Sequence, residues 1–353
     1  MARDMITLRG QGRVECTLQH AGAREVKFEG PQGQQTVPAW RVSAIEPAEM
    51  PAEWLGGRVA ISDGRFEEAT AAWDAMAGSG HRFAAWAGFQ AWNARRQRAE
   101  LSGRGLDQAL AAGETWLEQH PDDWNRAPAL FMQGVLAIEA AEASGHVTER
   151  AERFRVAERC LQALAEDQAF GPVWALYAKL GRARLGTFQK GVEAQVPRAF
   201  EAVRDEAEKT ELAREVAQMA EAWLARWRLG QGDARGLLRG LPRTEVDGQD
   251  LPAVLGSSWL GSPAAPVLLN AIGEALTALD ATAGPVAALP FHLRVTRYFP
   301  SQHVEHARAL ALSARGLVAS GNTSDGEALR ELLRARYPES RWATPVAQRR
   351  PGD

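Results

Sequence analysis

A short pattern occurs twice near the end of the chain, about one helical hairpin apart. Residues 297–301 read Arg-Tyr-Phe-Pro-Ser, and residues 336–340 read Arg-Tyr-Pro-Glu-Ser. Between them, residues 307–321 and 326–336 have the apolar spacing of amphipathic helices and are joined at a Gly-Asn turn. Two helices followed by an aromatic-proline stop form one repeating unit, so the pattern predicts stacked helical hairpins.

The size and charge of the chain exclude several classes of protein. Its 353 residues exceed the usual size of one compact core, so we expect several cores or an elongated array. The net charge of −3 gives no general attraction for nucleic acid or an anionic membrane. No stretch reaches the roughly 18 apolar residues of a membrane span, and the N-terminus lacks a signal-peptide core. We expect a cytoplasmic protein, or a periplasmic or envelope-associated one if an upstream signal peptide is missing.

The first fifty residues have the alternation of short strands. Val14, Cys16 and Leu18 alternate with polar residues, as do Val26 and Phe28, and glycine-containing turns separate the runs. About five such strands predict a small, separately folded barrel of the SH3-like or Sm-like kind. The segment resembles small β modules found at the front of bacterial repeat proteins.

The region after Pro51 has helical periodicity. Residues 64–73 read Gly-Arg-Phe-Glu-Glu-Ala-Thr-Ala-Ala-Trp, with Ala69 at a position where a small residue lets two helices approach. This segment resembles the second helix of a tetratricopeptide repeat, and similar fragments occur at 109–121 and 151–164. The resemblance implies an α-solenoid of helical hairpins that binds partners on its surface, often in bacterial envelope or multi-protein assemblies.

The expected fold is therefore mainly α: an α-solenoid of tetratricopeptide-like hairpins preceded by a small β-barrel. The expected segments are the barrel at 1–50, helical repeats at 54–240, an irregular Pro- and Gly-rich connection at 241–266, C-terminal hairpins at 267–342 and a flexible tail at 343–353.

Motifs that would carry catalysis or bind a cofactor are incomplete. Residues 230–236 contain glycines, but they follow a helix and lack the spacing of a dinucleotide-binding loop, so we interpret them as an interhelical turn. His303 and His306 could share one helical face, but no third metal ligand accompanies them. Cys16 and Cys160 fall in segments of different character, so we expect two buried thiols. We predict no catalytic, cofactor or metal site.

Two sets of residues are candidates for partner binding. Tryptophans within helical patterns are expected in the core, whereas those near turns are candidate contacts: Trp124, Trp259 and Trp342. Residues 281–353 carry 10 Lys and Arg against 6 Asp and Glu. The arginines of this region are expected on a basic helical face: Arg294, Arg297, Arg308, Arg330, Arg334 and Arg336. We propose Arg294, Arg297, Arg330 and Arg334 as a docking site for an acidic segment, because guanidinium groups bind carboxylates well. The alternative is a solvated surface.

The sequence thus predicts a non-catalytic scaffold or adaptor that binds a peptide or a subunit of a multi-protein assembly. The partner is expected to be a protein or peptide, with no nucleic acid and no cofactor. The alternative function is an enzyme whose site lies in residues 241–266, with the helices as its frame.

Overall fold

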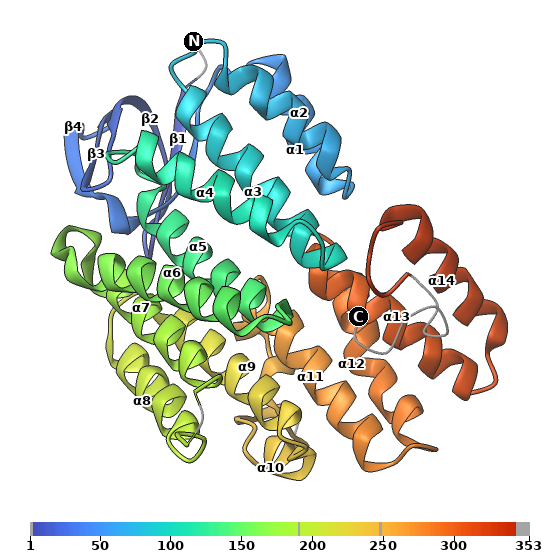
Figure 1. The fold of residues 1–353 in the computed structure, drawn as a ribbon. Coiled ribbons are helices and arrows are strands. Elements are labelled where there is room, and N and C mark those ends of the chain that lie inside the picture. The colour runs from blue at the N-terminus through green and yellow to red at the C-terminus, as the bar shows by residue number, and fades with distance from the viewer. Residues whose placement is uncertain (1–2, 190, 247–248, 344–353) are drawn as a thin grey trace. The chain divides into compact units, whose positions relative to one another are not determined.

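The computed structural model describes residues 3–189, 191–246 and 249–343, and within them it is mainly helical. The described residues form fourteen α-helices, and a five-stranded antiparallel sheet precedes them (Figure 1). The predicted order of a small β segment followed by helices is confirmed. No helix in the described ranges is long and apolar enough to cross a membrane. The predicted tail lies almost entirely outside the described residues, since 344–353 are not among them.

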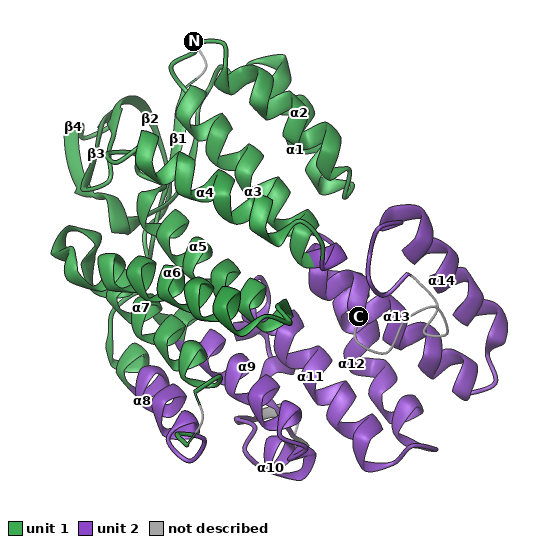
Figure 2. Cartoon of the chain, in the orientation of Figure 1, with its two compact units in different colours: residues 1–100, 104–192, 206–216 green, residues 101–103, 193–205, 217–353 purple. Residues whose placement is uncertain are grey.

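The chain divides into two compact units (Figure 2). The first unit comprises residues 1–100, 104–192 and 206–216. The second comprises residues 101–103, 193–205 and 217–353. The bounds of these two units differ from the segment bounds expected from the sequence. Whether each expected segment folds on its own therefore remains a prediction.

The sheet belongs to the first unit, and its strands follow the predicted alternation. They are β1 (Asp4–Leu8), β2 (Gly12–Ala21), β3 (Glu25–Gly30), β4 (Gly33–Pro38) and β5 (Val42–Glu46), in the order β4-β3-β2-β1-β5. In the register of the antiparallel pairs, Ile6 lies opposite Val14 and Val26 opposite Val37. Ile6, Val26 and Phe28 are completely buried, because every second side chain of a strand points to the same face. A short 3₁₀ turn, η1 (Ala39–Arg41), joins β4 to β5.

The sheet shares its hydrophobic core with the first helices. One cluster of buried side chains contains Ile6 and Phe28 from the sheet, Trp54 from α1 and Trp86 from α3. Residues 1–50 are therefore part of a larger core, although their ability to fold alone remains a prediction. The helices that begin in the first unit are α1 (Ala52–Ser62), α2 (Phe66–Ala77), α3 (Ala84–Ser102), α4 (Leu106–Gln119), α5 (Arg126–Ala143), α6 (Val147–Glu166) and α7 (Gly171–Gly186), with a 3₁₀ turn, η2 (Gln168–Phe170), before α7.

Small residues allow neighbouring helices to pack closely. Ala69 in α2 is completely buried, as its place in the repeat signature predicts. Tryptophans bridge α3 and α4 in both directions: Nε1 of Trp92 donates to the carbonyl of Ala109, and Nε1 of Trp116 donates to the carbonyl of Ala85, both at 2.9 Å. These reciprocal bonds satisfy the polar atom of each ring while its apolar body fills the core.

The helices that follow run into the second unit, and α8 and α9 each have residues in both units. They are α8 (Val196–Lys209), α9 (Arg214–Gly230), α10 (Ala234–Arg239), α11 (Ala264–Leu279), α12 (Gly284–Tyr298), α13 (His303–Ala319) and α14 (Thr323–Arg336). The glycine-rich segment before α10 is an interhelical turn, as predicted, in which Oδ1 of Asp233 accepts a 2.8 Å hydrogen bond from the Gly236 amide. The connection at 241–266 also contains a hairpin of β6 (Arg243–Val246) and β7 (Gln249–Pro252).

The repeated C-terminal pattern marks the ends of α12 and α14, but its register is shifted by one residue. Phe299 caps the C-terminal end of α12, and Tyr337 caps that of α14. The backbone N–H of each donates to the carbonyl of the residue four positions earlier, at 3.0 and 2.8 Å. Proline follows at 300 and 338. The structural equivalent of Tyr337 is therefore Phe299, whereas Tyr298 lies on the surface with 52% of its area exposed.

Candidate functional site

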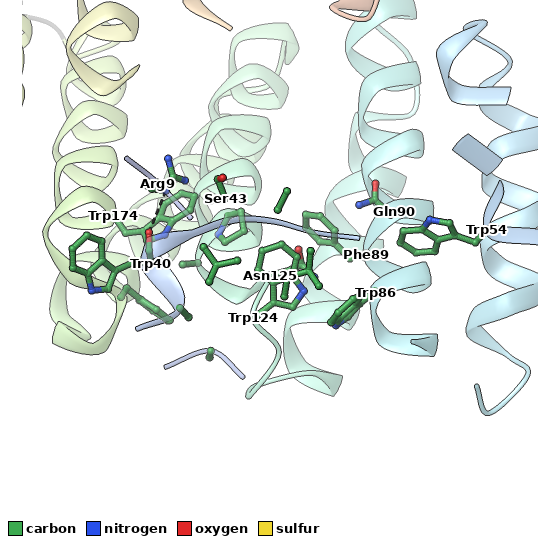
Figure 3. A pocket seen from close by; sticks show the side chains of 18 residues that line it. Arg9, Trp40, Ser43, Trp54, Trp86, Phe89, Gln90, Trp124, Asn125 and Trp174 are labelled. Carbon is green, nitrogen blue, oxygen red and sulfur yellow. Dashed lines mark hydrogen bonds between the residues drawn. The ribbon is translucent and has the colours of Figure 1, made fainter. Parts of the chain in front are cut away.

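An aromatic pocket of about 350 Å³ lies within the first unit (Figure 3). Its wall includes β5 and η1 on the sheet side and parts of α1, α3, α5 and α7 on the helical side. Seven lining residues are aromatic: Trp40, Trp54, Trp86, Phe89, Trp124, Phe170 and Trp174. The volume lies near the lower end of the range for ligand-binding sites, and concave apolar walls with a few polar groups are typical of them.

Local backbone geometry positions Trp40 at one end of the pocket. Pro38 ends β4, and the turn η1 that follows carries the Trp40 ring toward the start of α7. A Cβ atom on Gly171 would lie 2.4 Å from Cδ1 of this ring, and Gly171 has a φ of +76°. Only glycine fits this position without strain, so the Trp40 ring rests directly on the backbone before Trp174.

A second group of rings surrounds Trp86, which lines the pocket together with Trp124. The rings of Phe83 and Trp86 stack with centroids 4.7 Å apart, and Trp124 meets Trp86 edge-on at 5.8 Å. Asp123 orders the turn that contains Trp124, because its Oδ1 accepts hydrogen bonds from the backbone and side-chain nitrogens of Asn125 at 2.8 and 2.9 Å. Burial raises the pKa of Asp123, while the bonds from Asn125 and from the Trp86 indole oppose the shift.

The pocket wall contains an arginine whose charge is paired with a glutamate. Arg9 lines the pocket, and the described residues of the lining include no aspartate or glutamate. Nε of Arg9 donates to the Trp40 carbonyl at 3.1 Å, and its guanidinium lies 3.6 Å from Glu215. The Arg9 side chain is only 17% exposed, so these contacts hold the cation at the pocket wall. Ser43, Gln90 and Asn125 add neutral polar groups.

Two donors of the lining have no acceptor. Nε1 of Trp54 and Nε1 of Trp124 are buried, and no atom in the described part of the chain accepts a hydrogen bond from either. A buried donor without a partner typically costs about 1–3 kcal/mol. Both nitrogens are shielded from solvent by the surrounding side chains, as is Nε1 of Trp73, which lies outside the lining.

The tryptophans predicted as partner contacts have different surroundings. Trp124 is half-buried and lines the pocket. Trp259 is 6% exposed and belongs to the core of the second unit. Its burial does not support the prediction that it contacts a partner. Trp342 is half-buried, with the Arg341 guanidinium 4.5 Å from its ring centre. Trp86 lies within a helical pattern and was therefore expected in the core. It is buried, and it also lines the pocket.

The predicted basic face is less uniform than its spacing suggests. Arg294 is half-buried and donates to the carbonyl of Leu255 at 2.9 Å. Arg297 is exposed beside Tyr298, Arg330 is paired with Glu327, and Arg334 is exposed. Arg308 was expected on this face, and that expectation is wrong: its side chain is 14% exposed and paired with Glu274 at 2.6 Å, because α11 packs against α13.

His303 and His306 do face the same way, but toward a tyrosine. Their Nδ1 atoms lie 3.1 and 3.0 Å from the hydroxyl of Tyr337, and Nε2 of His306 lies 3.2 Å from the Thr296 carbonyl. Burial, followed by the charge of Arg336, lowers the pKa of His306 to about 4. This geometry assigns the pair to the packing of α13 on α14.

The segment predicted for the alternative enzyme is only partly described, since residues 247–248 lie outside the described ranges. The carbonyl of Ser258 accepts a 3.0 Å hydrogen bond from Gln218, which fixes the turn that contains it. Cys16 is buried and Cys160 half-buried, both as free thiols.

Comparison with models of known protein families gave no match, and comparison with curated protein sequences gave none either.

Proposed function

We propose that this chain is a non-catalytic interaction protein that binds a peptide segment of a partner, with the aromatic pocket of the first unit as the anchor site. The observation that carries the proposal is the set of seven aromatic side chains that line a pocket of about 350 Å³ in the first unit. Aromatic side chains with a polar edge are common anchors at interfaces.

The chemistry of the lining favours binding over catalysis. The titratable side chain among the lining residues is Arg9, which stays protonated and cannot act as a general base. The hydroxyl of Ser43 donates to the Thr7 carbonyl at 3.1 Å, and the described lining residues include no histidine or carboxylate that could activate it. What the pocket offers is apolar area and hydrogen-bond donors.

The proposal includes a repeat architecture of the tetratricopeptide kind. Three helices stop in the same way: φ is −127° at His120 and at Phe299 and −133° at Tyr337, and a proline follows each. Such a recurring stop supports repeated hairpins that stack into a solenoid. The strand order, with η1 between β4 and β5, supports a small SH3-like barrel as the module that closes one side of the pocket.

A peptide library tests this function. The full chain would be immobilised and panned against random twelve-residue peptides, in parallel with Trp124→Ala and Trp342→Ala variants. We expect peptides that the wild type and Trp342→Ala retain and that Trp124→Ala does not, because only Trp124 lines the pocket. Failure to enrich any peptide, or equal retention by all three proteins, would overturn the proposal.

A further inference from the structure

We propose that the outer face of α12 is a second docking surface, and that its occupant is an acidic amphipathic helix of a partner protein. The face lies in the second unit, so the proposal goes beyond the function assigned to the aromatic pocket and does not rest on it. It follows from a stripe of exposed apolar side chains and from an arginine at one end of this stripe.

Exposed side chains form one stripe along α12. Val286, Pro290, Leu293 and Arg297 are all exposed, and they follow one another at spacings of four, three and four residues. A helix completes a turn about every 3.6 residues, so these spacings place the four residues in a single row. The exposed fraction is 40% for Val286 and 38% for Leu293. The row is therefore apolar along two turns and ends in a cation.

The opposite face of α12 already belongs to the core. Ala288, His292 and Val295 are buried, and α12 packs against both α11 and α13. Arg294 also holds the helix, because its guanidinium donates to the carbonyl of Leu255 at 2.9 Å. Rotating α12 to bury its stripe would expose the core residues, so the apolar row stays available to a partner. Contiguous apolar surface with a polar rim is typical of protein interaction sites.

The C-terminal end of the stripe carries a charge that the chain does not neutralise. α12 contains two arginines and no aspartate or glutamate. The guanidinium of Arg297 lies 5.4 Å from the ring centre of Tyr298, and no carboxylate in the described part of the chain forms an ion pair with it. Tyr298 is 52% exposed, and both residue types are enriched among those that dominate binding energies. A partner carboxylate fits here, because guanidinium and carboxylate groups form forked hydrogen-bonded pairs.

A helix is the occupant that this face favours. An α-helix has no free backbone edge, so it cannot pair with an extended strand, and side chains must supply the contact. A partner helix with apolar residues at every third or fourth position places them against such a row. An aspartate or glutamate one turn beyond its last apolar residue then lies opposite Arg297.

Two other occupants fit this face less well. A second copy of the chain would oppose two α12 helices that carry arginines and no acidic residue, so neither copy offers a counterion. Segments that bind anionic membranes typically have clusters of about four to eight Lys and Arg. α12 has two, and Arg294 is already engaged by the Leu255 carbonyl.

The test is selection from a phage library of amphipathic helical peptides on the full-length protein. The library keeps an alanine-rich helix with leucine on one face, and each flanking position is either glutamate or lysine. We expect enrichment of peptides with glutamate near one end of the leucine face. The affinity of a selected peptide, measured by fluorescence polarisation, should fall at least about fivefold with Leu293→Ser and with Arg297→Glu. It should be unchanged with Trp124→Ala, which alters the pocket of the proposed function.

Matched controls separate this face from exposed residues elsewhere. Leu55→Ser removes a leucine of α1 that is 51% exposed, and Arg334→Glu reverses an exposed arginine of α14. Both variants should bind the selected peptide within about twofold of the wild type. Replacing the peptide's glutamate with lysine should weaken binding to the wild type and restore binding to Arg297→Glu, because the charges of the pair are exchanged.

Three outcomes would overturn the inference. The first is no enrichment of any helical peptide, and the second is equal affinity of a selected peptide for Leu293→Ser, Arg297→Glu and the wild type. The third is binding to vesicles of equal parts phosphatidylserine and phosphatidylcholine that both substitutions abolish, without peptide enrichment. Peptides that only Trp124→Ala fails to retain would support the proposed function and count against this second surface.

Discussion

The hydroxyl of Tyr337 lies 3.0 Å from Nδ1 of His306 and makes a second contact of 3.1 Å with Nδ1 of His303. Tyr337 ends α14 and is 1% exposed, while both histidines lie in the first turn of α13. One phenol therefore serves two imidazoles in the core of the last helical hairpin. A hydroxyl can do so because it donates one hydrogen bond and accepts others.

Removing this hydroxyl should destabilise the protein. We expect Tyr337→Phe to lower the free energy of unfolding by about 1–3 kcal/mol, because two buried imidazole nitrogens lose their partner. Urea denaturation followed by circular dichroism measures the change. Tyr298→Phe is the control: Tyr298 precedes the equivalent helix stop but is exposed, so its variant should stay within about 0.5 kcal/mol of the wild type. Equal stabilities of the two variants would contradict the assigned contacts.

Two buried histidines make stability depend on pH. Burial lowers the pKa of His292 to about 4, and the positive charge of Arg308 adds to this shift. Burial and, to a smaller extent, the charge of Arg336 lower the pKa of His306 to about 4. Between pH 6.5 and 4 the unfolded chain binds protons that the folded chain excludes, so stability is full above pH 6.5 and falls below it. The slope is at most about 1.4 kcal/mol per pH unit for each histidine.

The contribution of His306 can be isolated by comparison with a variant. His306→Asn keeps a polar group near Tyr337 but cannot be protonated. Its stability deficit relative to the wild type should shrink as the pH is lowered from 6.5 to 4.5, because only the wild type loses stability through this residue. A deficit that stays constant over this range would show that the pKa of His306 is not lowered.

Adjacent glycines of α1 should respond oppositely to alanine. A Cβ on Gly57 would lie 2.5 Å from the Trp73 ring, whereas one on Gly56 would meet nothing within 4 Å. We expect Gly57→Ala to lower the melting temperature through overpacking, and Gly56→Ala to raise stability by up to about 1 kcal/mol through helix propensity. Thermal denaturation of the two variants checks this. A stabilising Gly57→Ala would show that α1 and α2 do not approach as described.

Removing the sheet should weaken the helices of the first unit. A chain that starts at Pro51 lacks Ile6 and Phe28, which share a core cluster with Trp54 and Trp86. We expect a lower melting temperature and a smaller helical signal per molecule than in the full chain. This reverses the expectation of a separately folded module. Unchanged helical signal and melting temperature would restore the domain boundary predicted from the sequence.

Local sequence patterns predicted the elements well. The alternation around Val26 and Phe28 identified a strand, and the aromatic-proline stops identified the ends of α12 and α14. These features depend on backbone preferences within a few residues, so they are visible without tertiary contacts. The prolines already place Phe299 and Tyr337 at equivalent positions, but the opposite exposure of Tyr298 and Tyr337 depends on tertiary packing and is seen only in the structure.

The pocket could not be predicted in this way. Arg9 lies in the turn after β1, whereas Trp40, Trp54 and Trp174 belong to η1, α1 and α7, and no spacing along the chain relates these residues. Trp124 was identified as a candidate because it lies beside a turn. Arg308 illustrates the opposite error: helical spacing placed it on a basic face, but its acidic partner Glu274 lies on another helix.

The central claim is that the aromatic pocket, and not the C-terminal basic surface, binds the partner segment. The direct measurement is the affinity of one library-selected peptide for the wild type, for Trp124→Ala and for the double variant Arg330→Glu/Arg334→Glu, by fluorescence polarisation. We expect the affinity to fall at least about tenfold for Trp124→Ala and to change less than about twofold for the double variant. Binding that survives Trp124→Ala and is abolished by the double variant would contradict it.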